Sequence, residues 1–299
     1  MPRLRFLIVI AALVAMLASG SVGSPRAGAV TAPCGRTTTI PKWNHVIVIA
    51  FENQSYADVL GTGAPASEFT KLAGECGVGT NFAAVHYPHS LPTYIASTSG
   101  QVSITGDCLP GPSCQSGAAN IFSQLGPSQW RMFGESMPSN CAKTNSGNYV
   151  TRHLPALYYT RISAATCAAD ALPLPATFGA TKRKFVWIAP DQMSDMETGT
   201  PAQASAWLTN FLEGPAGILT HAPYTAGHTA VFIWFDTGGN GDTVSTPLPF
   251  IVISPSTPHT HSSAALNDYS ALRVWERMLG VPCANNACTA SPMGAHFHL

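Results

Sequence analysis

Short apolar runs alternate along the chain with segments whose apolar residues recur at helical spacing. Four runs have the length and the β-branched or aromatic content of buried strands: 46–50, 185–189, 230–235 and 250–253. Helical spacing occurs in three segments: 69–76, 204–211 and 269–279. Runs that are apolar on both faces are typical of parallel strands covered by helices on both sides. The pattern predicts an α/β fold, a three-layer α/β/α sandwich with a mostly parallel central sheet.

Two of the predicted helices have marked ends. Thr200 and Pro201 have the residue types of an N-cap followed by proline at the first helical position. Gly280, with Pro282 just beyond it, ends the last helix. No linker, repeat or low-complexity tract divides the mature chain, and its length of about 270 residues suits one domain. We therefore expect a single domain over residues 44–299.

The first residues have the pattern of a secretory signal. Arg3 and Arg5 form a basic start, 6–18 an apolar run, and Ala27-Gly28-Ala29 a cleavage site of small residues. This predicts a signal peptide over 1–29, an N-terminal lead segment over 30–43 and a secreted product. No segment is long and apolar enough to span a bilayer comfortably, so stable membrane insertion is not expected.

Eight cysteines follow the predicted cleavage site, and an even number in an exported chain indicates disulfides. Two pairs bracket short loops and are expected to be local: Cys108 with Cys114, and Cys283 with Cys288. The other four cysteines would then pair as Cys34 with Cys76 and Cys141 with Cys167.

Composition excludes one class of partner. The net charge is zero and only 10% of the residues are charged. Such a chain has no evident basic face to follow a phosphate backbone, so a nucleic-acid partner is not expected. Composition says nothing about the oligomeric state.

Acidic residues follow three of the predicted strands. They are Glu52, Asp191 and Asp236. Because parallel strands present their carboxyl ends at one edge of a sheet, these acids can converge, and converging carboxylates favour a cation. Simpler interpretations exist: Glu52 as a solvated strand end, Asn53 in a glycosylation sequon, and Asp236 as the start of a Gly-rich loop.

A series of motifs, in order, resembles a known family. The motifs are Glu52-Asn53-Gln54-Ser55-Tyr56, Ser90-Leu91-Pro92, Thr98-Ser99-Gly100, Glu135-Ser136-Met137-Pro138, Arg152-His153, Asp236 and Asp268-Tyr269-Ser270. From residue 45 to 299 the chain resembles the secreted phosphoesterase family of acid phosphatases. That family is related to bacterial phospholipases C and belongs to the alkaline-phosphatase-like superfamily.

The resemblance implies metal-dependent hydrolysis of phosphate esters. It makes Ser90 the nucleophile and gives His153 a role in catalysis close to the phosphate. A bound cation activates a Ser hydroxyl, and donor groups stabilise the phosphoryl oxygens. The substrate would be bound by Asn53, His153 and His89. The divalent metal would be bound by Glu52, Asn53, Ser90, Asp236 and Asp191.

The chain departs from the family pattern at several positions. Pro88-His89 replaces the usual His-Pro before the serine, and Thr237 follows Asp236 where a second acid is expected. Asp191, Asp195 and Glu197 occupy a segment where an Asn and a His are expected, and Asp268 stands where a His is usual. Carboxylates in place of imidazoles indicate a harder cation such as Ca²⁺ or Mg²⁺, with Mn²⁺ or Zn²⁺ as alternatives, or a site that has decayed.

Each candidate also has a structural interpretation. Ser90 lies in a Pro-rich stretch expected to be a turn, and His153 can be a surface residue beside Arg152. Asn267 or Asp268 can be a helix N-cap. Asp195 and Glu197 can be solvated loop acids, so Asp191 at the strand end ranks above them.

The leading functional hypothesis is an acid-phosphatase-like hydrolase of small soluble phosphomonoesters. A catalytically degenerate phosphate- or metal-binding protein and a phospholipase C-like phosphodiesterase are the alternatives. A metal-free serine esterase is disfavoured, because the chain has no G-x-S-x-G nucleophile elbow at Ser90. The sequence has no basic amphipathic segment that would indicate a membrane-facing surface.

Overall fold

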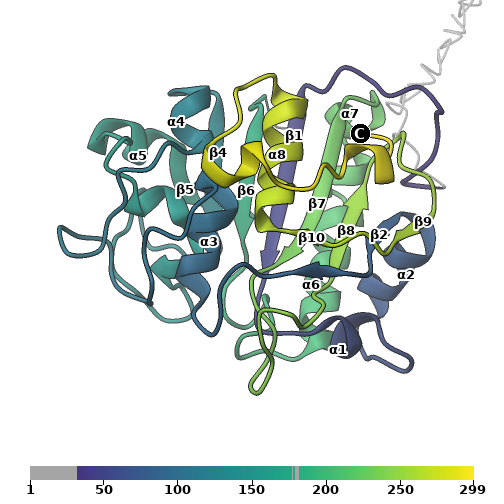
Figure 1. The fold of residues 1–299 in the computed structure, drawn as a ribbon, viewed down its shortest axis with the longest axis horizontal. Coiled ribbons are helices and arrows are strands. Elements are labelled where there is room, and N and C mark those ends of the chain that lie inside the picture. Colours follow the sequence, from purple (N-terminus) through teal and green to yellow (C-terminus); the bar gives the residue numbers. More distant parts are fainter. Residues whose placement is uncertain (1–31, 177, 179–181) are drawn as a thin grey trace, which may run out of the picture.

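The computed structural model describes residues 32–176, 178 and 182–299 (Figure 1). The predicted signal peptide over 1–29 lies outside the described residues, as does the beginning of the lead segment. Among the residues described, no helix has the length and apolar character needed to cross a bilayer.

A large mixed sheet forms the centre of the molecule. Its strands follow the order β5-β4-β6-β1-β7-β8-β2-β9. They are β1 (His45–Phe51), β2 (Gly77–Gly79), β4 (Trp130–Gly134), β5 (Ala171–Pro173), β6 (Phe185–Ala189), β7 (Thr229–Phe235), β8 (Phe250–Ile253) and β9 (Thr260–Ser262). A separate two-stranded sheet pairs β3 (Phe82–Ala83) with β10 (Leu266–Asn267). The five strands from β5 to β7 run parallel, while β8 is antiparallel to both β7 and β2. The predicted mostly parallel sheet is confirmed, although the pattern did not show the reversal of β8.

Helices cover both faces of this sheet (Figure 1). They are α1 (Tyr56–Leu60), α2 (Ser67–Glu75), α3 (Ser90–Ser99), α4 (Ile121–Leu125), α5 (Ala164–Asp170), α6 (Pro201–Glu213), α7 (Ala222–Thr225) and α8 (Asp268–Leu279). The helices predicted from apolar spacing correspond to α2, α6 and α8. Thr200 caps α6 with Pro201 at its first position, and Gly280 ends α8 in the left-handed conformation, both as predicted.

Aromatic side chains fill the space between the sheet and its two helical layers. On one face Phe51 packs against Phe69 of α2 and Trp207 of α6. On the other face Tyr94 of α3 packs against Trp187 and Trp234. Trp275 of α8 extends this second cluster. Alternate residues of the strands therefore bury large rings on opposite faces, which explains why the strand runs are apolar throughout.

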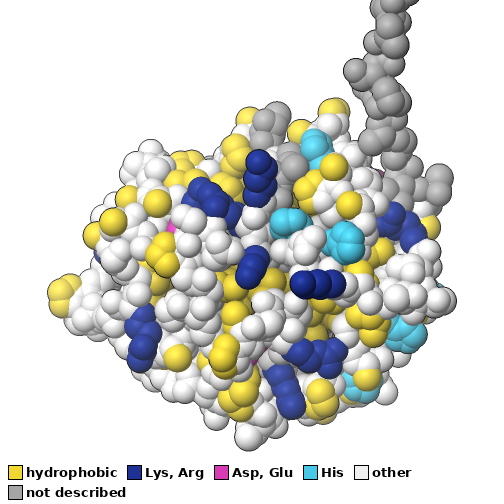
Figure 2. Space-filling model, turned by 90° about the horizontal axis from the view of Figure 1, so that it is seen from above, with side chains coloured by type: hydrophobic (Ala, Val, Ile, Leu, Met, Phe, Trp, Pro, Cys, Tyr) yellow, Lys and Arg dark blue, Asp and Glu magenta, His cyan; other side chains and the backbone are white. Residues whose placement is uncertain are grey.

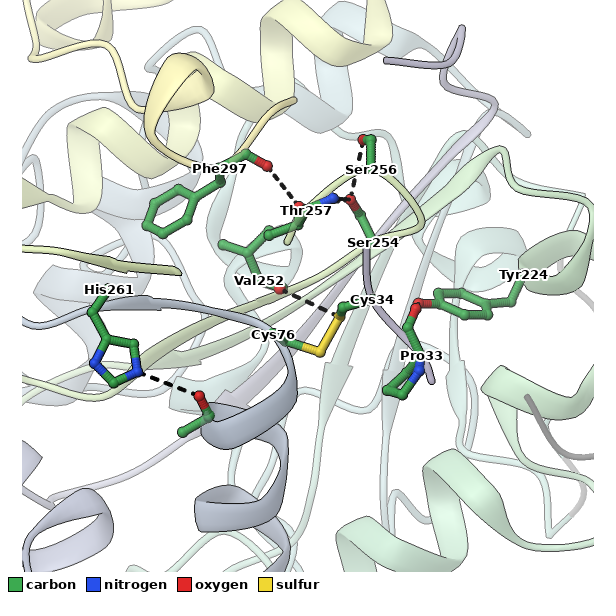
Figure 3. The surroundings of a disulfide bond; sticks show 11 residues. Pro33, Cys34, Cys76, Tyr224, Val252, Ser254, Ser256, Thr257, His261 and Phe297 are labelled. Carbon is green, nitrogen blue, oxygen red and sulfur yellow. Dashed lines mark hydrogen bonds between the residues drawn. A yellow bond between two sulfur atoms is a disulfide. The ribbon is translucent and has the colours of Figure 1, made fainter. Parts of the chain in front are cut away.

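All four predicted disulfides are present. They join Cys34 to Cys76, Cys108 to Cys114, Cys141 to Cys167 and Cys283 to Cys288. The first attaches the segment before β1 to the end of α2 (Figure 3). Beside it, the hydroxyl of Tyr224 donates to the carbonyl oxygen of Pro33. The N-terminal segment is thereby held against the end of α2 and against α7.

One helix differs from the prediction at a functionally important place. The stretch around Ser90, expected to be a turn, is the start of α3, with Ser90 as its first residue. Pro92 is compatible with this helix because the amide groups of the first turn have no intrahelical partner. The turn prediction was therefore wrong, and Ser90 sits at a helix N-terminus.

Glu276 of α8 provides a test of the packing. It is 1% exposed, and neither carboxylate oxygen has a hydrogen-bond partner among the described residues. Burial raises the pKa of Glu276 from 4.5 to about 8. Between these two pH values the native protein keeps a proton on Glu276 that the unfolded chain has lost. The free energy of unfolding therefore falls as the pH rises through this window.

In the wild type we expect the free energy of unfolding to fall with rising pH in this window, by at most about 1.4 kcal/mol per pH unit. In Glu276→Gln this part of the pH dependence should be absent, because glutamine does not ionise. Urea unfolding of both proteins from about pH 5 to about pH 8 measures it. Parallel stability curves for the two proteins would show that Glu276 is already ionised in the native state.

Candidate metal and phosphate site

The ends of β1 and β7 bring two predicted acids together. Phe51 pairs with Phe235 in the parallel register, so Glu52 and Asp236 leave the sheet side by side. Both are fully buried. The backbone N–H of Asn53 donates to Asp236 Oδ1 at 3.1 Å. The predicted convergence of acids at the carboxyl edge is present for this pair.

Helix α3 directs two hydroxyl groups at Glu52. Ser90 Oγ donates to Glu52 Oε2 at 2.8 Å. Tyr94, one turn further along the helix, donates to Glu52 Oε1. A helix N-terminus favours negative charge, so the position of Ser90 suits a group that develops negative charge during a reaction.

His153 lies in a short 3-10 helix (Thr151–His153). It completes the group of side chains formed by Glu52, Asp236, Ser90 and Tyr94. Its Nε2 lies 3.3 Å from Glu52 Oε1 and 3.5 Å from Glu197 Oε2. Its Nδ1 lies 3.1 Å from Asp195 Oδ2. The ring stacks on Tyr94 with 5.4 Å between centroids and 9° between planes. A carboxylate at Nδ1 is the usual way to orient a histidine whose Nε2 binds a metal.

The residues present fit a cation. One ligand atom each from Glu52, His153 and Glu197 lies within 4.8 Å of the others. His153 Nε2 and Asp236 Oδ2 are buried and have no hydrogen-bond partner among the described residues. Burial raises the pKa of Glu52 well above its usual range, and Asp236, Asp195 and Glu197 raise it further. Unpaired polar atoms and crowded carboxylates are costly, and a divalent ion would relieve both.

Arg152 and Asp195 are further charged residues beside this group. Arg152 pairs with Glu197 through its guanidinium. The backbone N–H of Glu197 donates to Asp195 Oδ1 at 2.8 Å. Burial also raises the pKa of Asp195 and of Asp236. Two carboxylates and one imidazole, with the Asp236 carboxylate adjoining, suit Ca²⁺, Mg²⁺ or Mn²⁺ better than they suit a thiolate-preferring metal.

Thr237 orients Asn53. Its Oγ1 donates to Asn53 Oδ1 at 3.2 Å, which leaves the amide Nδ2 of Asn53 as the free donor. Thr237 is fully buried. The departure from the expected second acid thus replaces a charge with a group that directs the Asn53 amide.

The structure does not bring every predicted residue into this group. Both carboxylate oxygens of Asp191 bind other groups: Oδ2 accepts from Ser136 Oγ, in the loop after β4, at 2.6 Å, and Oδ1 accepts from the Met193 N–H in its own loop at 3.0 Å. His89 is 48% exposed, with Nδ1 3.5 Å from Asp107. The metal role of Asp191 and the substrate role of His89 therefore stay predictions, because neither side chain makes a hydrogen bond or ion pair with Glu52 or His153 in the described part of the chain.

Asp268 has a structural role next to the helix cap that was expected at this position. Asn267 is the N-cap of α8. Asp268 is fully buried and accepts from the Val85 N–H and from Trp234 Nε1, each at 2.8 Å. Burial raises the pKa of Asp268 to about 8.

Three residues of the group were ranked too low or missed in the sequence. Asp195 is fully buried and Glu197 half-buried beside His153, although Asp191 seemed the better candidate. Tyr94 was not considered. Its only signal was its place four residues after Ser90, which puts both on one helix face if the segment is helical.

A polar cavity of ≈ 650 Å³ opens beside this group. Its lining includes Asn53, Tyr87, Glu197, Gly239 and Asp242. Asn53 and Glu197 belong to both the group and the cavity, so a molecule bound in the cavity can reach the cation site. The crevice outside the carboxyl ends of the strands is where open α/β sheets bind ligands.

The chain is similar to a protein of known name over nearly its whole length. No model of a known protein family matches the chain. The chain is 25% identical over 304 residues to the phosphatidylinositol-3-phosphatase of Mycobacterium tuberculosis, covering 97% of this chain and 93% of that protein.

Solved structures show the fold class. A protein of the alkaline phosphatase superfamily from Vibrio parahaemolyticus has a TM-score of 0.55 at 10% identity, covering 88% of this chain and 74% of that one. An inactive variant of murine ectonucleotide pyrophosphatase/phosphodiesterase 5 in complex with AMP has a TM-score of 0.50 at 9% identity, covering 80% and 96%. The chain therefore has the fold of proteins of the alkaline-phosphatase superfamily, as the sequence predicted.

Metal binding can be tested without an activity assay. A divalent cation that binds only the native state at about 100 times its dissociation constant adds about 2.7 kcal/mol of stability, and so raises the melting temperature. We expect Glu52→Gln and Glu197→Gln to lose most of the cation-induced rise.

Asp191→Asn is the matched control, because it changes the acid at the strand end that the structure keeps out of the group. It should retain the cation-induced rise even if its own melting temperature is lower. Loss of the rise in Asp191→Asn, with retention in Glu197→Gln, would reverse the assignment of ligands.

Proposed function

We propose that the protein is an exported, metal-dependent phosphomonoester hydrolase of the secreted phosphoesterase family, with Ser90 as its nucleophile. The relative of known name, similar over nearly the whole chain, is a phosphatase. The motifs that resemble the acid phosphatases supply Glu52, Asn53, Ser90, His153 and Asp236, and these side chains lie together in the fold.

The observation that carries the proposal is the position of the Ser90 hydroxyl. Ser90 is 5% exposed and lies at a helix N-terminus, and its Oγ donates directly to the carboxylate of Glu52. A serine that only forms a turn would not be expected to direct its hydroxyl at a buried carboxylate. The arrangement suits a hydroxyl that must lose its proton beside a cation.

The reaction would proceed in two displacements. Ser90 Oγ loses its proton and attacks the phosphorus atom, the bond to the leaving oxygen breaks, and that oxygen takes up one proton, so the proton count is unchanged. Water then attacks the phosphoseryl group, the bond to Ser90 Oγ breaks, the water oxygen leaves with the phosphate, and one water proton restores the serine hydroxyl. A divalent ion held by Glu52, His153 and Glu197, with Asp236 adjoining, would supply charge for the phosphoryl oxygens and favour the ionised hydroxyl.

The protein's own groups have separate tasks in this scheme. The Asn53 amide, oriented by Thr237, donates to a phosphoryl oxygen. Asp195 holds His153 with Nε2 toward the group. Arg152 fixes Glu197. The polar cavity beside Asn53 would receive the leaving group, and its lining suits a hydrophilic one.

Replacing the nucleophile tests the mechanism. We expect Ser90→Ala to lower kcat at least about a thousand-fold, because nucleophile removal in other hydrolases costs more than this. Ser97→Ala is the matched control on the same helix, since Ser97 Oγ donates only to the Tyr94 carbonyl oxygen. Steady-state hydrolysis of a chromogenic phosphomonoester, with and without chelator, measures both variants.

Retained turnover in Ser90→Ala, or in the presence of chelator, would refute this mechanism. A wild-type protein that shows the cation-induced rise in melting temperature but hydrolyses no phosphomonoester or phosphodiester would instead be the non-catalytic binding protein. Faster hydrolysis of a diester than of the matching monoester would make it a phosphodiesterase.

A further inference from the structure

The face at which the central strands begin carries a group of basic side chains. We call this the basic face and define it by its residues: Arg36, Lys42, His45, Lys182, Lys184 and His228. The four Lys and Arg side chains are all exposed, as is His228. Figure 2 looks onto this side and shows Lys, Arg and His side chains with almost no acidic ones.

Three distant segments of the chain build the basic face. The Val46 N–H donates to the Lys184 carbonyl oxygen at 2.8 Å, which joins the starts of β1 and β6. The His45 N–H donates to the His228 carbonyl oxygen at 3.2 Å, which joins the starts of β1 and β7. These backbone contacts place the basic residues side by side, although nothing in their sequence spacing indicates it.

The histidines of the basic face are held in defined orientations. His45 Nδ1 lies 2.7 Å from the Arg183 carbonyl oxygen, and His228 Nδ1 lies 2.9 Å from the Lys42 carbonyl oxygen. A carbonyl oxygen only accepts, so Nδ1 carries the proton and donates in each case.

Acidic side chains concentrate elsewhere. Asp58, Glu197 and Asp242 line the cavity at the opposite edge of the sheet, beside the buried carboxylates. Near the basic face, Asp170 pairs with Arg131 and is 1% exposed. The molecule is therefore electrically polarised along its strands, although its net charge is zero. Composition does not record where charges lie, so a chain of zero net charge can still carry this basic face.

The shape of the basic face decides between kinds of anion. None of its residues lines the cavity at the catalytic edge, and its side chains are spread over several element ends. A small phosphate or sulfate ion would need convergent donors in a pocket. A broad exposed face suits an extended anionic surface, and Ile40, 50% exposed and two residues before Lys42, can add an apolar contact.

We propose that the basic face docks the protein peripherally on an anionic phospholipid bilayer. Electrostatic attraction of this kind acts through clustered Lys and Arg and weakens with salt. The strands then point away from the bilayer, and the cavity beside Glu52 and Asn53 faces the surrounding solution. This orientation favours water-soluble substrates, and the docking itself does not depend on the proposed catalysis.

Vesicle sedimentation tests the docking. The purified protein is mixed with phosphatidylcholine vesicles, with or without about 30 mol% phosphatidylglycerol, at roughly 50 mM and 500 mM salt. We expect binding to anionic vesicles only, and mainly at low salt. The double variant Lys42→Glu/Lys184→Glu should bind at least about tenfold more weakly.

Lys143→Glu is the matched control, an exposed lysine in the loop after β4, on the catalytic side of the sheet. It should bind like the wild type, and all variants should keep the same melting temperature and the same turnover of a soluble ester. Equal binding to neutral vesicles, equal loss in Lys143→Glu, or retention of a soluble polyanion such as heparin without vesicle binding would each overturn the proposal.

Discussion

Crowding of buried carboxylates at one edge of a parallel sheet is the constraint on which the rest of this structure depends. Glu52 and Asp236 are carried there by neighbouring strands, and Asp195 and Glu197 by the loop after β6. Each group raises the cost of ionising the next. Such an arrangement persists in a folded protein when a cation compensates it, and the unpaired nitrogen of His153 points to the same place.

The aromatic core positions the site as well as stabilising the fold. Tyr94 contacts Trp187 and Trp234 of the sheet, stacks on His153 and donates to Glu52. Trp234 in turn donates to Asp268, and Trp187 to the His153 carbonyl oxygen. Large rings with a polar end thus connect the hydrophobic interior to the carboxylates, which limits how far the candidate ligands can move.

Charge is distributed unevenly along the strand direction. The carboxyl ends gather acids that need a cation, whereas the amino ends gather exposed lysines and oriented histidines (Figure 2). An anionic ester approaching the acidic edge would be repelled unless a metal ion were bound there, so the proposed hydrolysis would require the cation.

The sequence by itself determined the runs that form β1, β6, β7 and β8, the helices α2, α6 and α8, the two local disulfides and the class of fold, because apolar periodicity, local caps and short loops are properties of short segments. It also identified Glu52, Asn53, Ser90, His153 and Asp236 as candidates, though their roles rest on resemblance. Only the tertiary structure decided that Glu197 and Asp195, rather than Asp191, lie against His153, that Ser90 begins a helix, and that scattered lysines share a face. These outcomes depend on side-chain direction and on contacts between residues far apart in the chain, and neither is encoded in local pattern or composition.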